Sequence, residues 1–344
     1  MNTATPRHCD TCHSAQPSFS EKLLAWYAHS QRTLPWRLTT PNPYYTWLSE
    51  IMLQQTTVAT VIPYFQAFTH KWPTVADLAA ASLDEVLTQW QGLGYYSRAR
   101  NLHQCAQALA QNFPTTETEL MKLPGIGPYT AAAIASIAFG QKAAAVDGNV
   151  VRVMSRYFAI AIPNPTQEVT EALLPLIPED QCGDFTQSLM ELGALICRPK
   201  APLCTACPLQ NECQAHLLGR EEDFPVKVAK KKIPTRYTTA FIVKREDGAI
   251  LLRKRVASGL LGGMMEVPMT PWEDTPSDTH QSRVRHTFTH FHLEVDVQTC
   301  EDEEAFEGVW VHPRDMHTYA LPTLMKKVLQ WSSGAVEQCS SVAV

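Results

Sequence analysis

The chain has 344 residues, of which 45% are hydrophobic and 18% charged, and its formal net charge is −5. This composition is typical of a globular protein and excludes collagen-like and strongly charged disordered chains. No apolar run approaches the length of a membrane span, and residues 1–18 lack the apolar stretch of a signal peptide. We therefore expect an intracellular protein of two or three domains, because one hydrophobic core rarely serves so long a chain.

The charge distribution leaves nucleic acid open as a partner. A net negative charge argues mildly against it, since strong binders often carry a basic excess. The acidic residues 301–307 lie in the C-terminal third, however, and a basic face needs to be positive only where it touches phosphate. The N-terminal two-thirds carry a set of basic residues that could form such a face: Arg98, Arg100, Arg152, Arg156, Arg198 and Lys200.

The first 220 residues predict a helical domain. Apolar residues recur at helical spacing, and Pro and Gly interrupt the pattern at short intervals, which indicates many short helices joined by tight turns. A charged, Pro-containing stretch then reads as a linker. We expect a disordered tail at 1–18, the helical domain at 19–220, the linker at 221–236, an α+β domain at 237–332 and a second tail at 333–344.

The C-terminal domain is predicted from alternating and β-branched residues. Residues 237–243 and 249–255 read as strands that pair as a hairpin across a Glu-Asp-Gly turn. Residues 288–297 alternate apolar and polar side chains, so they predict another strand, and residues 323–331 predict a closing helix.

Four cysteines predict a metal centre. Cys197, Cys204, Cys207 and Cys213 fall within 17 residues, with the spacing C-x6-C-x2-C-x5-C. Disulfides are rare inside cells, and clustered thiolates select zinc or an iron–sulfur cluster. The spacing alone does not separate these two metals. A second pair, Cys9 and Cys12 with His13, has ligand spacing but no further ligands nearby, so we expect a disordered tail there.

A glycine-rich turn predicts a phosphate-binding hairpin. The stretch Leu-Pro-Gly-Ile-Gly-Pro-Tyr-Thr (123–130) precedes a helix, and Gly125 and Gly127 would let backbone N–H groups approach an anion closely. A plain turn between helices is the alternative. Downstream, Asp147 precedes Gly148 at the start of another helix, where it is either a helix cap or a carboxylate placed beside the hairpin.

The hairpin, the downstream Asp and the four-Cys loop, in that order, resemble the helix–hairpin–helix DNA glycosylases of the endonuclease III superfamily over residues 19–219. The motifs Leu-Pro-Trp-Arg (34–37), Trp-Leu-Ser-Glu-Ile-Met-Leu-Gln-Gln-Thr (47–56) and Gly-Leu-Gly-Tyr-Tyr-Ser-Arg-Ala-Arg-Asn (92–101) are similar to its adenine-specific, MutY-type branch. The resemblance implies a [4Fe–4S] cluster on the four cysteines, which would be structural because glycosidic hydrolysis needs no electrons.

The resemblance also implies the catalytic residues. Glu50 would be the general acid that protonates adenine N7, sheltered by an apolar wall from Leu48, Ile51 and Leu53. Ionised Asp147 would stabilise or capture the oxocarbenium-like sugar. Tyr129 and Asn149 would orient Asp147 and the attacking water. Superfamily members that also cleave the strand carry Lys at position 129, so Tyr here predicts little or no lyase activity.

Further residues match the family's base-binding positions. The base must leave the duplex before catalysis, at a cost of roughly a few kcal/mol. The positions lining the extruded-adenine pocket are Trp36, Arg37, Leu53 and Gln187. The positions surrounding 8-oxoguanine on the other strand are Gln55, Thr56, Leu93 and Tyr95, with Tyr95 wedged into the base stack. For Leu93 and Tyr95 the alternative is plain core, although the flanking Gly92 and Gly94 indicate an exposed loop.

Residues 259–268 resemble the start of a Nudix hydrolase fold, but residues 270–281 lack the acidic, magnesium-binding helix of those enzymes. We therefore expect no diphosphate hydrolysis. The stretch Arg-His-Thr-Phe-Thr-His-Phe (285–291) is similar to the Phe-Ser-His loop by which this family's C-terminal domain senses 8-oxoguanine. Phe288, Thr289 and His290 would take that role, with the Thr hydroxyl replacing that of Ser.

The prediction is thus a monomeric base-excision enzyme that acts on double-stranded DNA holding adenine opposite 8-oxoguanine or guanine. It would lie on the bacterial nucleoid, or in the nucleus of a eukaryote. Two rivals stay open: a thymine- or oxidised-pyrimidine-specific glycosylase of the same superfamily, and a non-catalytic DNA-binding protein whose cluster senses redox state.

Overall fold

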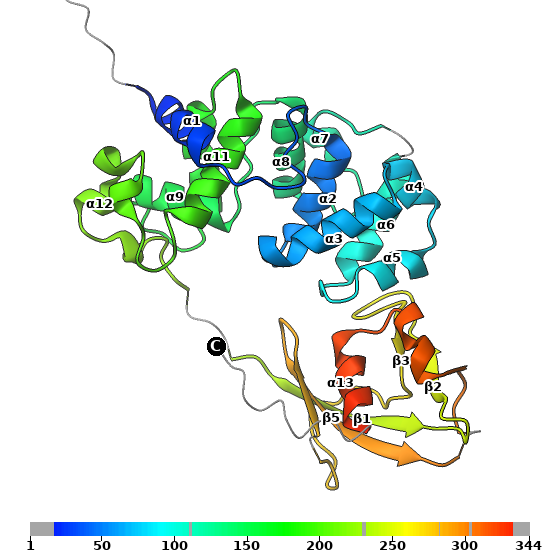
Figure 1. Cartoon of the computed structure of the whole chain (residues 1–344). Coiled ribbons are helices and arrows are strands. Elements are labelled where there is room, and N and C mark those ends of the chain that lie inside the picture. The colour runs from blue at the N-terminus through cyan, green and yellow to red at the C-terminus, as the bar shows by residue number, and fades with distance from the viewer. Residues whose placement is uncertain (1–16, 110–111, 229–231, 282, 303–304, 333–344) are drawn as a thin grey trace, which may run out of the picture. The chain divides into compact units, whose positions relative to one another are not determined.

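The computed structural model describes residues 17–109, 112–228, 232–281, 283–302 and 305–332 (Figure 1). The two tails predicted from the sequence lie largely outside these ranges, as do Cys9, Cys12 and His13. The chain divides into two compact units. The first consists of Met1–Arg32 and Ala135–Val228, and the second of Thr33–Ile134 and Ala229–Val344.

The first unit is helical, as the sequence predicts. Its first helix begins where Ser18 and Glu21 form a capping box, each bonding the other's backbone N–H. Its main helices are α1 (Phe19–Ser30), α9 (Gly148–Tyr157), α10 (Thr166–Leu173), α11 (Cys182–Leu195) and the short α12 (Gln214–Leu217).

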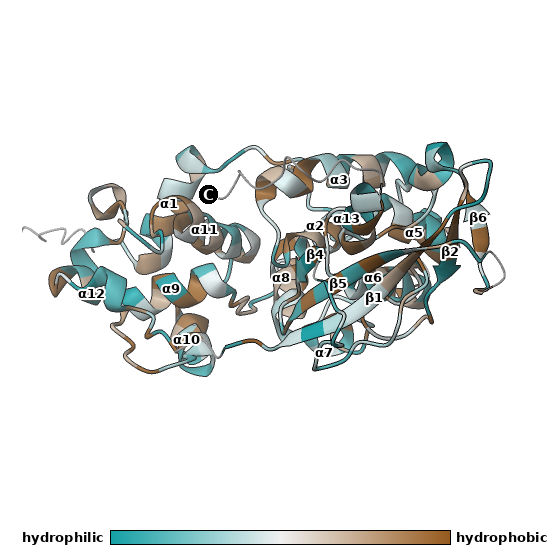
Figure 2. Ribbon diagram, turned by 90° about the horizontal axis from the view of Figure 1, so that it is seen from below, coloured by the Kyte–Doolittle hydropathy of each residue, from teal (hydrophilic) through white to brown (hydrophobic). Residues whose placement is uncertain are grey.

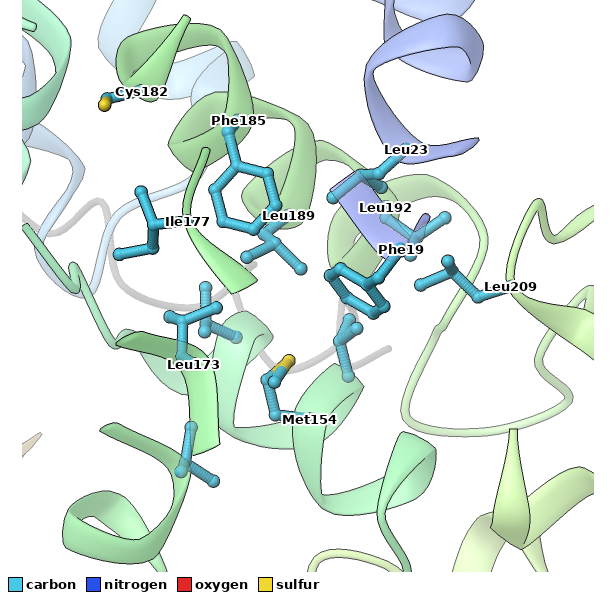
Figure 3. Packing of buried hydrophobic residues seen from close by; sticks show 13 residues of the cluster. Phe19, Leu23, Met154, Leu173, Ile177, Cys182, Phe185, Leu189, Leu192 and Leu209 are labelled. Atoms are coloured by element: carbon cyan, nitrogen blue, oxygen red, sulfur yellow. The ribbon is translucent and has the colours of Figure 1, made fainter. Parts of the chain in front are cut away.

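The core of the first unit lies between α1, α9, α10 and α11. Phe19 and Leu23 of α1 meet Met154 of α9, and Phe185 and Leu189 project from α11 into the same cluster (Figure 3). Each of these side chains is at most 7% exposed. Burying such side chains contributes about 1.5–3 kcal/mol each, so this cluster fixes α9, whose first turn carries Asp147 and Asn149.

The second unit opens with a helical part. Trp47 and Trp90, both fully buried, lie in its core together with Phe65 and Phe68. The helices are α2 (Pro43–Leu53), α3 (Val58–Lys71), α4 (Val75–Ala80), α5 (Leu83–Gln89), α6 (Ser97–Leu109) and α7 (Glu117–Leu120). Helix α8 (Pro128–Phe139) begins in this unit, at the end of the glycine-rich hairpin, and ends in the first one.

The C-terminal part of the second unit is α+β, with two three-stranded sheets in the order β1-β5-β4 and β3-β2-β6. Strands β1 and β5 are parallel and lie side by side (Figure 2). Helix α13 (Thr323–Ser332) confirms the predicted closing helix. The strands are β1 (Thr235–Val243), β2 (Ile250–Lys254), β3 (Met265–Glu266), β4 (Val284–Thr287), β5 (His292–Cys300) and β6 (Val309–Val311).

Two strand predictions are wrong in detail. The expected hairpin of β1 and β2 exists only at its turn, where Lys244 bridges Ile250, after which the two strands enter different sheets. The expected strand at 288–297 begins only at His292. Residues 288–291 instead form a turn between β4 and β5, in which the Phe288 N–H donates to the Phe291 carbonyl at 2.9 Å. Apolar alternation does not reveal such a turn, because its aromatic residues are also packed.

Among the described residues, no helix is both long enough and apolar enough to cross a bilayer.

Candidate functional site

Glu50 and Tyr129 form a hydrogen-bonded pair in the second unit. Asn42 caps the start of α2 by accepting from two backbone N–H groups, and Glu50 follows two turns later with 7% of its surface exposed. The Tyr129 hydroxyl, from the first turn of α8, donates to Glu50 Oε2 at 2.7 Å. Burying a carboxyl disfavours its charged form unless donors compensate. Glu50 is therefore a largely buried carboxyl with an ordered donor beside it.

The hairpin before α8 has the geometry expected from its glycines. Gly125 has φ +74°, and a Cβ there would lie 2.6 Å from the Cβ of Asn101, so the turn requires glycine. Space around the Cα of Gly127 is open. Pro128 is the first residue of α8, where its missing N–H costs nothing. The hairpin thus places a tight glycine turn directly before the N-terminus of a helix.

Asp147 is the N-cap of α9 in the first unit, which confirms the helix-cap alternative raised from the sequence. Its Oδ1 accepts from the Val150 N–H at 2.7 Å, and its Oδ2 accepts from Asn149 Nδ2 at 2.8 Å. Each carboxylate oxygen is therefore held by one donor. The same side chain that caps the helix is fixed in direction, as a carboxylate acting on a substrate must be.

Arg152 extends this arrangement to the cysteine loop. Its Nη2 donates to Asn149 Oδ1 at 2.9 Å and to the Gly193 carbonyl at 2.7 Å, and its Nε donates to the Cys197 carbonyl at 2.7 Å. A Cβ at Gly193 would lie 2.5 Å from the Cβ of Asn149. From the sequence we expected Arg152 only as part of a basic face and assigned no role to Gly193. The contact between Arg152 and Asn149 could have been predicted from their i, i+3 spacing, which places both side chains on the same face of α9.

The four cysteine side chains line one cavity with Arg156. Burial raises the pKa of the free thiols of Cys207 to about 12 and of Cys204 to about 11. Metal binding would thus have to displace their protons. The Arg156 guanidinium, 2% exposed, donates to Cys197 Sγ at 3.3 Å and to the Arg198 carbonyl at 2.8 Å. Four convergent sulfur donors beside a buried cation fit an anionic, thiolate-bound metal centre.

A second possible ligand group adjoins this cavity. His216 Nδ1 lies 2.6 Å from Glu221 Oε1, and Cys204 Sγ lies 3.6 Å from the same oxygen. The three side chains are close enough to share an ion. All three side chains line the cavity of the four cysteines, so they belong to the same candidate site.

The residues predicted to line an adenine pocket are divided between the units. Trp36 packs edge-on against Phe65 with ring centroids 5.3 Å apart, and the Arg37 N–H closes a turn on the Leu34 carbonyl at 3.0 Å. Leu53 is the last residue of α2. These belong to the second unit, whereas half-buried Gln187 lies on α11 in the first.

Most of the residues predicted to surround 8-oxoguanine meet in one pocket of about 780 Å³ in the second unit. The Thr289 hydroxyl donates to the Tyr95 hydroxyl at 3.1 Å, across 194 positions of sequence. Tyr95 is 47% exposed, but Leu93 is only 4% exposed and, like Thr56, does not line the pocket. The prediction that Leu93 is exposed, made from its flanking glycines, is therefore wrong. The predicted residues in the lining are Gln55, Tyr95, Phe288, Thr289 and His290.

Two of these lining residues have strained backbones. Gln55 has φ +57° and Tyr95 has φ +46°, in the left-handed region that side chains other than glycine rarely adopt. Such conformations persist only where neighbouring structure enforces them, and they gather at binding sites. Here they aim two polar side chains from the helical part into the pocket.

Arg98 links the two turns from inside the unit, so its expected place in an exposed basic face is wrong. Its side chain is 9% exposed and donates to the carbonyls of Ile51 at 2.8 Å, Met52 at 3.0 Å and Leu93 at 3.0 Å. Burial lowers the pKa of Arg98 to about 10, so it remains cationic at neutral pH. The buried cation joins the C-terminus of α2, just before Gln55, to the turn that carries Tyr95.

Two family models match the chain. Residues 48–179 match the HhH-GPD superfamily base excision DNA repair protein, and residues 239–331 match the NUDIX domain. The first range includes Glu50, Tyr129 and Asp147, and the second includes the turn at 288–291.

Curated proteins and solved structures are similar as well. Adenine DNA glycosylase of Homo sapiens is 36% identical, covering 92% of this chain and 74% of its own length. Adenine DNA glycosylase of Buchnera aphidicola subsp. Baizongia pistaciae is 40% identical, covering 70% of this chain and 71% of its own length. The structure of a thermostable thymine-DNA glycosylase is 31% identical, with a TM-score of 0.54, and covers 58% of this chain and 95% of its own. The structure of a non-covalent endonuclease III–DNA complex is 27% identical, with a TM-score of 0.51, and covers 58% of this chain and 94% of its own.

Proposed function

The chain belongs to the adenine DNA glycosylases of base excision repair, and on that premise we propose that it removes adenine paired with 8-oxoguanine or guanine, without cleaving the strand. The observation that carries the proposal is the bond from the Tyr129 hydroxyl to the buried Glu50 carboxyl. A sheltered acid is what adenine needs in order to leave, and a phenol at position 129 cannot form the imine that a lyase requires.

In the proposed reaction Glu50 protonates adenine N7, and the glycosidic bond breaks as the sugar gains cationic character. Tyr129 holds the Glu50 carboxyl in one orientation, so the proton is delivered along a fixed direction. Ionised Asp147 stabilises the sugar cation or captures it, and water then completes hydrolysis. Asn149 keeps Asp147 Oδ2 in place through its 2.8 Å bond. Trp36, Arg37, Leu53 and Gln187 would line the pocket of the extruded base.

The four cysteines would hold a [4Fe–4S] cluster, which the donor set and the buried Arg156 support. When bound, such a cluster supplies four metal–sulfur links that brace the loop after α11. Through Arg152, this loop touches Asn149 and so the catalytic carboxylate. We assign the cluster a structural role.

The substrate is double-stranded DNA, which a monomer would bind through the hairpin at Gly125 and Gly127 and through the pocket of the second unit. The hairpin would hold a phosphate without reading sequence. Tyr95 would enter the base stack beside the lesion, and the Thr289 hydroxyl would bond the edge of 8-oxoguanine, where guanine carries different groups. Such an enzyme works at the nucleoid, or in the nucleus of a eukaryote.

The test uses duplexes holding adenine opposite 8-oxoguanine, adenine opposite guanine, and thymine opposite guanine. Strand breaks are scored with and without alkali, since a glycosylase without lyase activity leaves an abasic site that breaks only in alkali. We expect alkali-dependent breaks at adenine, fastest opposite 8-oxoguanine. Breaks at thymine, or breaks without alkali, would contradict the proposed substrate or the proposed lack of lyase activity.

Thr289→Val provides the matched test of lesion sensing, because it removes the hydroxyl but keeps the shape of the side chain. It should reduce the preference for 8-oxoguanine over guanine and leave the rate on adenine opposite guanine unchanged. An unchanged preference would remove Thr289 from the lesion site.

A further inference from the structure

Residues 268–273 form an extended segment fixed to the edge of β1. The Phe241 N–H donates to the Pro268 carbonyl at 2.8 Å, and the Thr270 N–H donates to the Thr239 carbonyl at 3.0 Å. Tyr237 and Glu273 exchange two backbone bonds of 2.8 and 2.9 Å. The segment therefore has a defined backbone, although the sequence predicts neither the acidic helix nor any other element there. Trp272 directly precedes Glu273, the last residue of the segment that is hydrogen-bonded to β1.

Trp272 lies against the turn that carries Thr289. Its ring stacks on Phe288 with centroids 5.8 Å apart and planes 29° apart, and it meets Phe291 at 5.5 Å. Phe288 and Phe291 themselves pack at 4.9 Å, and His286 meets Phe288 edge-on at 4.6 Å. The residues on both sides of Thr289–His290 are thus packed on one aromatic cluster, while Thr289 and His290 are exposed.

Arg255 fixes the other side of this cluster. Its guanidinium lies 5.4 Å from the centroid of the Trp272 ring, and it forms an ion pair with Glu266, whose side chain is 5% exposed. Arg253 bonds the same carboxylate at 3.0 Å. The ion pair with buried Glu266 limits the movement of the Arg255 side chain. Its cation–π contact in turn limits the movement of the Trp272 ring.

We propose that Trp272 is a positioning residue for base recognition, because it holds the turn at residues 288–291 in the conformation that directs the Thr289 hydroxyl into the pocket. The hydroxyl reads one side of a base only if its direction is fixed before binding, since a freely moving turn would have to be ordered on each encounter. Trp272 supplies that order from a segment outside the turn. The proposal rests on the proposed lesion-reading function of Thr289.

The test compares Trp272→Leu with Trp272→Phe and with Trp310→Leu. Trp310 is the matched control, since it is also half-buried under an arginine, Arg245 at 5.2 Å, but lies on β6 in the other sheet. Hydrogen exchange of the Phe288 amide is measured in the free protein. Single-turnover excision rates are measured for adenine opposite 8-oxoguanine and opposite guanine.

We expect Trp272→Leu to speed exchange of the Phe288 amide about tenfold and to reduce the ratio of the two excision rates about tenfold, the loss expected for one or two aromatic pairs. Trp272→Phe should restore most of both quantities, and Trp310→Leu should change neither. Unchanged exchange in Trp272→Leu overturns the proposal, as does an equal slowing of both substrates. A wild-type protein without preference for 8-oxoguanine overturns the proposed function instead, since the exchange measurement needs no substrate.

Discussion

The Tyr129 hydroxyl donates a 2.7 Å hydrogen bond to Glu50 Oε2. The two residues come from different helices, α8 and α2, and are 79 positions apart in the chain. The glycine-rich hairpin leads directly into α8, so the turn proposed to hold a DNA phosphate is continuous with the helix that places Tyr129 against Glu50, the proposed acid.

Removing this bond should slow chemistry without weakening binding. Tyr129→Phe keeps the ring but deletes the donor, and a bond to a charged or acidic group contributes about 1.5–3 kcal/mol. We expect single-turnover excision to fall about tenfold to a hundredfold, with the Kd for a duplex holding a non-cleavable adenine analogue unchanged. An equal change in Kd would mean that Tyr129 acts in binding rather than catalysis.

Asp147 can be tested apart from its structural role, because Asn is as good an N-cap as Asp. Asp147→Asn should retain the melting temperature of the wild type but lose at least about a hundredfold in excision rate, as expected when a charge facing the transition state is removed. Asp147→Ala, which loses the cap as well, should also melt earlier. Retained turnover in Asp147→Asn would reject the catalytic assignment.

Two glycine variants test the proposed phosphate-binding hairpin, because one combines steric overlap with backbone strain and the other has backbone strain alone. Gly125→Ala meets Asn101 at 2.6 Å and also carries φ +74°, whereas Gly140→Ala has a similar φ of +65° but open space. Each positive φ costs an alanine about 1–2 kcal/mol. Both variants should lose stability in urea unfolding, but only Gly125→Ala should lose affinity for undamaged duplex. Equal affinity of the two variants would argue against the hairpin as the phosphate site.

Iron content tests the cysteine cluster. Cys207→Ser should lose bound iron and the visible absorption of an iron–sulfur centre, and its melting temperature should fall, because the metal links residues of one loop. Cys182→Ser is the control: Cys182 is 1% exposed, and its thiol lies 3.2 Å from the Pro178 carbonyl, outside the cluster cavity. Zinc in place of iron in the purified protein would contradict the [4Fe–4S] assignment.

Arg98 should be among the more costly arginines to replace. Arg98→Met leaves buried carbonyls of α2 and of the turn at Leu93 without their donor, and we expect a loss of about 3 kcal/mol in the free energy of unfolding. The control Arg314→Met removes a side chain that is 78% exposed and pairs with Asp315 at 3.5 Å, so its unfolding curve should match the wild type. A small effect at Arg98 would show that water replaces its bonds.

The sequence by itself determined the class of each domain and indicated the candidate site residues. Helical apolar spacing, the four cysteines and the glycine-rich hairpin are local patterns, and local patterns encode helices, ligand sets and turns. The family motifs indicated Glu50 and Asp147 as well. Prediction from the sequence was wrong at 288–291, where aromatic residues alternate through a turn. It was also wrong at 237–255, where two adjacent strands enter different sheets.

The tertiary structure decided which side chains meet. The Glu50–Tyr129 bond, the bonds from Arg152 to the carbonyls of Gly193 and Cys197, and the Thr289–Tyr95 contact join residues from separate segments, and no local pattern encodes such pairings. The bonds of Arg98 to the residues around Gln55 and Tyr95 are also long-range contacts that the local sequence does not encode. The physical reason is that long-range contacts form only when packing brings distant backbone together, and that packing depends on the whole chain.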